Sequence, residues 1–290
     1  MKTDVNIIAT KKIYSGKKIL SNQNNTYVIK DGIKSTYNYQ QIVAIKKPDW
    51  LKIKINSSNN IKKIKELAKN KSLNTVCEEA KCPNIHECWS HGTATFMLMG
   101  KICTRACRFC SVDTGNPKQW LDQDEPKKLS QAIQQMNLKY IVLTSVDRDD
   151  LNDGGATHYA SCINQIMSDS SHMAIEVLVP DFSGNENSIK KILDTKIKVF
   201  SHNIETVYRL THPVRDIRAT YERSLQVLDF AKKNSNNILT KTSLMLGLGE
   251  TEAEIIKTMH DLRKIKVDIL TLGQYLRPTM NHLPVIEYIN

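Results

Sequence analysis

Six of the seven cysteines in this 290-residue chain lie within 34 consecutive residues. They form two trios, which are Cys77-x4-Cys82-x5-Cys88 (the first trio) and Cys103-x3-Cys107-x2-Cys110 (the second trio). Clustered thiols in a chain that starts without an apolar secretory segment bind metals or do redox work more often than they form structural disulfides. The spacing therefore predicts two metal sites.

The incomplete ligand sets favour iron-sulfur clusters over structural zinc. A structural zinc site is normally closed by four ligands, and neither trio offers four cysteines. Three thiolates on a four-iron cube leave one iron available for another ligand, which is chemically useful. Zinc stays an alternative for the first trio, because His86 or His91 completes a Cys3His site there. Otherwise these two histidines are ordinary polar loop residues.

The segment 101–112, KICTRACRFCSV, resembles the radical S-adenosylmethionine motif Cys-x3-Cys-x-aromatic-Cys, with Phe109 at the aromatic position. Together with VCEEAKCPNIHECW at 76–89 it is similar to the lipoyl synthase family, in which a second cluster is bound by Cys-x4-Cys-x5-Cys just upstream. The resemblance covers roughly residues 47–287. It is also carried by KPDWLKIKI (47–55), TSVDRDDLNDGGA (144–156), FSHNIET (200–206), THPVRDIRATYERSL (211–225), MLGLGET (245–251) and LTLGQYLRPTMNHLPV (270–285).

The resemblance implies a sulfurtransferase that inserts two sulfur atoms at C6 and C8 of a protein-bound octanoyl group, forming the lipoyl cofactor. It implies two 4Fe-4S clusters and S-adenosylmethionine as cofactors. The second trio would hold the cluster that works with S-adenosylmethionine, and the first trio a cluster consumed as sulfur source. The implied partners are an octanoylated lipoyl-carrier domain, an external electron donor and a cluster-repair protein. Another radical S-adenosylmethionine enzyme and a non-catalytic metal-binding protein are the alternatives.

Three further residues are candidate cofactor contacts. Phe109 either lies beside the adenine or simply packs in the core. Asn203 and Glu205, in the HNIET segment, either contact the ribose or methionine part of the cofactor or cap a turn and a helix start. Gly247 and Gly249 permit close backbone approach. No acid–base or nucleophilic residue is assigned, because such cofactors carry the chemistry themselves.

Alternating strand and helix patterns must position these residues. Six β-rich runs follow or precede amphipathic helical segments, which predicts parallel strands with right-handed crossovers. The expected strands are 93–100, 139–146, 173–180, 197–204, 238–247 and 268–276, and the expected helices are 156–167, 187–194, 219–233 and 251–265. The resemblance implies a partial (β/α)6 TIM-type barrel with an N-terminal cluster-binding extension. The second trio directly follows the first strand, so we expect it at the carboxyl-terminal rim.

Three segments are expected: a basic extension over 1–46, an auxiliary-cluster module over 47–92, and the barrel over 93–290. Short strands or disorder are both open for the first. The family's C-terminal tail carries an Arg-Ser-Ser-Tyr motif, and one of its serines ligates the auxiliary cluster, which the first trio would hold here. This chain reads to Asn290 without it, so no serine ligand is assigned. Cys162 falls in a helical pattern and is expected to pack as a small apolar residue.

The net charge of +11 lies at one end of the chain. Residues 1–71 hold 16 Lys against 4 acidic residues, or +12, which leaves −1 for the remainder. Because few aromatic residues lie among these lysines, the charge pattern predicts a solvated extension rather than a nucleic-acid surface. Clustered charge also speeds encounter with an oppositely charged partner, so the extension is expected to steer an acidic carrier domain. Neither nucleic acid nor a membrane is expected as partner. The expected location is the bacterial cytoplasm, or a plastid stroma if organelle-encoded.

Overall fold

The computed structural model describes residues 18–21, 25–31, 45–51, 59–79, 82, 84–90, 93–136, 138, 140–235, 237–279 and 281–290. Most of the basic extension 1–46 lies outside these residues. His91, one of the two histidines considered for zinc, also lies outside them.

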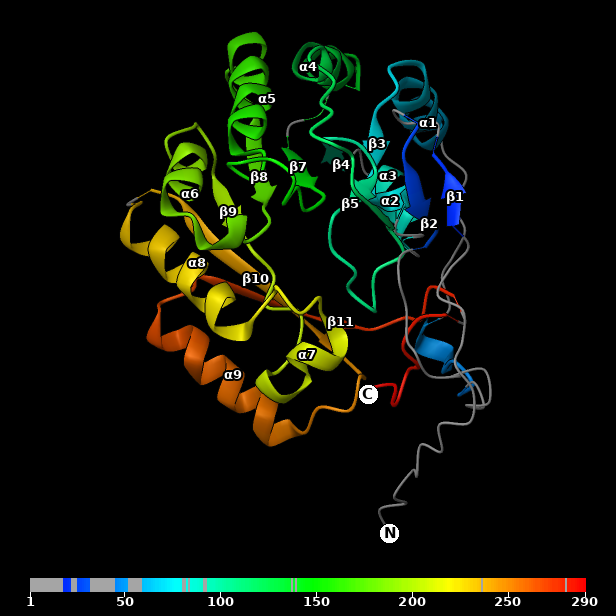
Figure 1. The fold of residues 1–290 in the computed structure, drawn as a ribbon, viewed down its shortest axis with the longest axis vertical. Coiled ribbons are helices and arrows are strands. Elements are labelled where there is room, and N and C mark those ends of the chain that lie inside the picture. Colours follow the sequence, from blue (N-terminus) through cyan, green and yellow to red (C-terminus); the bar gives the residue numbers. More distant parts are fainter. Residues whose placement is uncertain are drawn as a thin grey trace.

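Six parallel strands form the main sheet (Figure 1). The parallel pairings run β4–β7–β8–β9–β10–β11, and the short β3 (Asn74–Thr75) adds antiparallel to β4. All six strands expected from the sequence are confirmed; each is shorter than its apolar run, and β4 and β9 are half as long or less. Their bounds are β4 Thr95–Leu98, β7 Tyr140–Ser145, β8 Ala174–Leu178, β9 Val199–Ser201, β10 Leu239–Leu246 and β11 Ile269–Gln274. The fold is a partial TIM-type barrel.

Helices connect the strands and cover the outside of the curved sheet (Figure 1). The four expected helices are α5 Ala156–Asp169, α6 Glu186–Leu193, α8 Tyr221–Lys233 and α9 Glu252–Lys264. The sequence analysis missed α4 Glu125–Met136, which fills the crossover from β4 to β7, and the short α7 Thr211–Val214. Helix α9 begins with a capping box, in which the Thr251 side chain and the Glu254 side chain each bond the other's backbone N–H.

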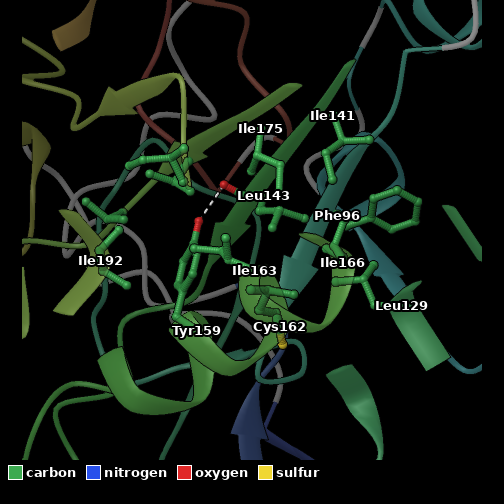
Figure 2. Packing of buried hydrophobic residues seen from close by; sticks show 14 of the residues in the cluster. Phe96, Leu129, Ile141, Leu143, Tyr159, Cys162, Ile163, Ile166, Ile175 and Ile192 are labelled. Atoms are coloured by element: carbon green, nitrogen blue, oxygen red, sulfur yellow. Dashed lines mark hydrogen bonds between the residues drawn. The ribbon is translucent and has the colours of Figure 1, made fainter. Parts of the chain in front are cut away.

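The larger core lies between this sheet and its helices (Figure 2). On α5, residues spaced three and four apart face the sheet, so Tyr159, Ile163 and Ile166 pack against Leu143 of β7. The Tyr159 hydroxyl donates to the Leu143 carbonyl, which gives this buried polar group a partner. Cys162 lies on the same face and is fully buried, as its helical pattern predicts.

A second sheet of four strands, in the order β1-β2-β6-β5, carries part of the second trio. Its strands are β1 Lys18–Leu20, β2 Tyr27–Ile29, β5 Ile102–Cys103 and β6 Asp113–Gly115. Strand β2 pairs with β6, and β6 pairs with β5, so part of the basic extension lies beside the cysteine loop. The sequence analysis left short strands open but not this pairing. The bounds of the three expected segments remain a prediction.

Three helices lie between β2 and β4 in the chain. They are α1 Asn59–Asn70, α2 Val76–Glu79 and α3 Ile85–Ser90, with a 3-10 turn at Asp49–Leu51 before them. Further 3-10 turns lie at Phe182–Gly184 and Tyr208–Leu210. In the part of the chain that the structure describes, no helix combines the length and apolarity needed to cross a bilayer.

Candidate cluster and cofactor site

The second trio lies on one loop that leaves the sheet after β5. Cys103 ends β5, and Cys107 and Cys110 follow before β6 begins. The loop is tied to the segment after α7: the Arg108 N–H donates to the Val214 carbonyl at 2.9 Å, and the Ala106 N–H to an Asp216 carboxylate oxygen at 2.8 Å. These contacts fix the loop backbone independently of any bound group.

The three cysteines of this loop are half-buried, and two of their sulfur atoms receive backbone hydrogen bonds. The Arg105 N–H donates to Cys103 Sγ at 3.4 Å, and the Asp216 N–H to Cys107 Sγ at 3.3 Å. Burial, reinforced by Asp147, raises the pKa of Cys103 well above its usual range, and burial raises the pKa of Cys107 to about 12. Thiols in this setting become thiolates only with a cationic group, which an iron-sulfur cluster supplies.

A cavity of about 340 Å³ lies where β4, β7, β8 and β9 end, the edge where α/β barrels bind their ligands. Its size is that of a small-molecule site. Apart from the first trio, every expected cofactor or cluster residue lines it, namely Cys103, Cys107, Phe109, Cys110, Asn203 and Glu205. The structure thus brings together residues that lie about a hundred positions apart.

Asn203 and Glu205 follow the end of β9. The Glu205 N–H donates to the Ser243 carbonyl, and the Glu205 carbonyl accepts from the Met245 N–H. The backbone of Glu205 is left-handed, with a φ of 66°. Burial raises the pKa of the Glu205 carboxyl, while Arg215 and a hydrogen bond from Asn203 act in the other direction. The next helical turn is capped by Val207, so neither side chain serves as its cap. A half-buried carboxylate that lines a cavity and belongs to a residue with left-handed backbone is typical of a ligand site.

Phe109 lies between the cavity and an apolar cluster. It lines the cavity, and it is also partly buried against the smaller apolar cluster, which contains Tyr275 and Leu283. Its contact with adenine remains a prediction.

The sequence analysis missed a buried ionic network beneath the second trio. Its centre is Arg105, whose side chain is 3% exposed. The guanidinium donates to both oxygens of Asp181 at 2.7 and 2.8 Å and to Asp149 at 2.8 Å, and lies 3.3 Å from Asp147. Although burial opposes its charge, these carboxylates raise the pKa of Arg105. A signal for this network was present in the sequence, because the three aspartates directly follow the carboxyl ends of β7 and β8, where functional residues gather.

A second missed group lies behind Asn203. His202 is buried, with Nδ1 2.9 Å from the Val179 carbonyl and Nε2 3.1 Å from Ser224 Oγ. Burial and the nearby Arg215 lower the pKa of His202 to about 4, so the imidazole is neutral. Arg215 donates to the same Ser224 hydroxyl at 2.7 Å, while its buried Nε finds no hydrogen-bond partner among the residues that the structure describes. His202 and Arg215 both line the cavity.

The first trio lies on and between the short helices α2 and α3. Cys77 belongs to α2, Cys88 to α3, and the Cys82 N–H donates to the Cys77 carbonyl at 3.0 Å. Burial raises the pKa of Cys82 and of Cys88, and the other thiols of the trio raise both pKa values further. None of the three lines the cavity, but Val76, next to Cys77, does.

The spacing of the sulfurs does not suit a single zinc ion. With Zn–S bonds of about 2.3 Å, two sulfur ligands lie at most about 4.6 Å apart. Within the described residues, only Glu125, His158 and Cys162 bring three ligand atoms within 4.8 Å of one another. In each trio at least one pair of sulfur atoms therefore lies more than 4.8 Å apart. In the Glu125 group, His158 lies 2.7 Å from the carboxylate, which is a hydrogen-bond distance.

Family models match most of the chain. The radical SAM superfamily model matches residues 97–262, and the model for the N-terminal domain of lipoyl synthase matches residues 15–82. A lipoyl synthase of Francisella tularensis subsp. holarctica (strain LVS) is 54% identical over 278 residues, covering 96% of this chain and 84% of the relative. A lipoyl synthase of Legionella pneumophila (strain Corby) is 57% identical over 277 residues, covering 96% and 83%.

Solved structures agree on the fold. Methylornithine synthase aligns with a TM-score of 0.53 at 11% identity, covering 78% of this chain and 67% of that one. The FeFe-hydrogenase maturase HydG of Carboxydothermus hydrogenoformans gives 0.53 at 17% identity, covering 68% and 46%. With the sequence relatives, these findings establish an enzyme of the superfamily that uses a 4Fe-4S cluster and S-adenosylmethionine. The chain belongs to the lipoyl synthase family, and its activity is the radical-mediated insertion of two sulfur atoms at C6 and C8 of a protein-bound octanoyl group.

Proposed function

We propose that the two trios hold two separate four-iron clusters with different tasks. The second trio binds the cluster that works with S-adenosylmethionine, and the first trio binds a cluster that is a substrate, because its sulfides become the inserted sulfur atoms. The observation that carries this proposal is the arrangement around one cavity. The second trio lines it, and the module of the first trio reaches it through Val76.

When bound, the cluster of the second trio would supply one electron to each of two S-adenosylmethionine molecules in turn, giving methionine and a 5′-deoxyadenosyl radical each time, so that one radical would remove a hydrogen atom from C6 and the other from C8. The residues of this chain hold and shield that chemistry. Asn203 and Glu205 provide an amide and a half-buried carboxylate at the cavity wall for the polar parts of S-adenosylmethionine. Phe109 offers an aromatic face for the adenine.

One part of the remaining cavity wall suits an alkyl chain, whereas Arg105, Asp147, Asp181 and Arg215 make another part charged. The apolar side chains in this wall are those of Met97, Val112, Val146, Leu178, Val179 and Ala219. Such a lining excludes water from a reactive radical and accepts an octanoyl group by burial of apolar surface.

A direct tie connects the two cysteine regions. The Ser111 hydroxyl, one residue after Cys110, donates to the Glu79 carbonyl at the end of α2 at 2.7 Å. Fixed relative positions of two reacting groups lower a barrier by about 7–11 kcal/mol in favourable intramolecular models. We therefore assign this contact to holding the first-trio module against the loop of the second trio.

The partners follow from this chemistry. The substrate is an octanoylated lipoyl-carrier domain, an external donor supplies electrons, and a repair protein rebuilds the consumed cluster. The bacterial relatives support the cytoplasm as the place of action. The Lys-rich extension fits an acidic carrier surface by charge.

Mass spectrometry tests the assignment. An octanoylated carrier is incubated without oxygen with reconstituted protein, dithionite and S-adenosylmethionine. Wild type adds two sulfur atoms to the octanoyl group and releases 5′-deoxyadenosine. Cys88→Ala releases 5′-deoxyadenosine without sulfur insertion, and Cys107→Ala does neither. Cys162→Ala removes a core thiol outside both trios and serves as the control that retains both. Sulfur insertion by Cys88→Ala contradicts the proposed division of tasks.

A further inference from the structure

The backbone of Cys110 is held by a residue far along the chain. His282 Nε2 lies 2.9 Å from the Cys110 carbonyl oxygen. The His282 side chain belongs to a residue with no exposed surface, in the segment after β11. Two residues 172 positions apart thus meet at the end of the cysteine loop.

The partners of His282 fix its tautomer. A carbonyl oxygen only accepts, so Nε2 carries the proton and donates to Cys110. The Thr279 N–H, 3.2 Å from Nδ1, only donates, so Nδ1 is unprotonated. The Thr279 hydroxyl lies 2.8 Å from the same nitrogen and donates as well. The imidazole is therefore a neutral bridge between its own segment and the cysteine loop.

The segment around His282 is itself well anchored. The His282 carbonyl accepts from Arg277 Nε at 3.0 Å, and the next carbonyl, of Leu283, accepts from the Tyr275 hydroxyl at 2.9 Å. The Leu283 N–H approaches the Arg108 carbonyl at 3.5 Å. From the other side, Val214 and Asp216 hold the same loop. The loop from Cys107 to Cys110 is thus clamped between two segments, and His282 is the contact at its third cysteine.

We propose that His282 is a positioning residue for the cluster of the second trio. By donating Nε2–H to the Cys110 carbonyl, it fixes the third thiol in the place that cluster binding requires. The inference rests on the proposed binding of a cluster by the second trio. Residues that orient metal ligands typically contribute about 10- to 100-fold to metal affinity.

Two substitutions separate the bridge from the fold of the segment. In His282→Asn the amide oxygen replaces Nδ1 as acceptor for Thr279, but the side chain ends short of Cys110. In His282→Gln the amide nitrogen reaches the position of Nε2 and restores the donor. Both are made in a parent with the first trio replaced (Cys77→Ala, Cys82→Ala and Cys88→Ala), so that all bound iron reports on the second trio.

The readouts are iron retained against a chelator, the electron paramagnetic resonance spectrum of the reduced cluster, its reduction potential, and melting of the cluster-free protein. We expect His282→Asn to lower the apparent affinity for iron by about 10- to 100-fold and to shift the spectrum and potential. His282→Gln should recover most of the affinity for iron and most of the parent's spectrum and reduction potential. The cluster-free variants should melt within about 4 °C of the parent.

Unchanged iron retention, spectrum and potential in His282→Asn overturn the inference. Equal losses in the Asn and Gln variants also overturn it, because packing of the imidazole rather than the donated hydrogen bond would then be responsible. A parent that binds no iron refutes the proposed function itself, which is distinguishable from both results.

Discussion

Replacing Arg105 should be among the most damaging single changes outside the cysteines. Its guanidinium is 3% exposed, and Asp181, its bidentate partner, has a side chain that is 1% exposed. Arg105→Met leaves Asp181 buried beside Asp147 and Asp149 with no central cation. Removing one partner of a buried ion pair costs about 3–5 kcal/mol, a large share of the stability of an ordinary domain. Arg105→Lys should recover only part of this, because an ammonium does not form the two-pronged contact.

Urea unfolding of the cluster-free protein, followed by circular dichroism under reducing conditions, measures this cost. Asp149→Asn is the matched control, because its partly exposed side chain is screened by solvent and its loss should cost about 1 kcal/mol or less. In a double-mutant cycle, adding Asp181→Asn to Arg105→Met should cost less than Asp181→Asn alone. A loss below about 1 kcal/mol for Arg105→Met, with an unchanged m-value, would refute the reasoning.

Three further outcomes follow from local geometry. The pKa of about 4 for folded His202 lies below its ordinary 6.5, so its contribution to stability is complete above pH 6.5 and is lost as the pH falls toward 4. The loss is at most about 3 kcal/mol, and the gap in unfolding free energy between wild type and His202→Asn should shrink over that range; a constant gap contradicts this. Gly247→Ala should destabilise the protein by about 1–3 kcal/mol more than Gly249→Ala. Both glycines have positive φ, but only at Gly247 would the added Cβ collide with a backbone oxygen, that of Glu287. Equal melting temperatures of the two variants would contradict this. Glu205→Gln should weaken binding of S-adenosylmethionine, measured by calorimetry on reconstituted protein, while leaving iron content unchanged, and iron loss would show a structural role instead.

The six parallel strands of the main sheet and the four helices α5, α6, α8 and α9 were predictable because burial imposes a regular pattern on the sequence. Helix α4 was predictable too, since Leu129, Ala132, Ile133 and Met136 form a buried stripe at helical spacing, although the sequence analysis passed over it. The pairing of β2 with β6 was not predictable. Strands of three residues carry too little alternation to fix a partner 85 positions away.

Local spacing revealed the cysteines, whereas long-range contacts that orient them stayed hidden. Arg105 meets Asp181 across 76 residues, and His282 meets Cys110 across 172. No single stretch of sequence shows that a charge or an imidazole is buried against a partner on another strand end. Asn203 and Glu205 were found because they follow a strand in a barrel, where the carboxyl ends share one rim.

The central claim is that each trio holds its own four-iron cluster. Iron, sulfide and zinc analysis of protein reconstituted without oxygen, combined with Mössbauer spectroscopy, tests it most directly. The account predicts about eight irons per chain in wild type and about four when either trio is replaced by alanine. About four irons in wild type, no change when the first trio is removed, or zinc in place of iron would contradict it.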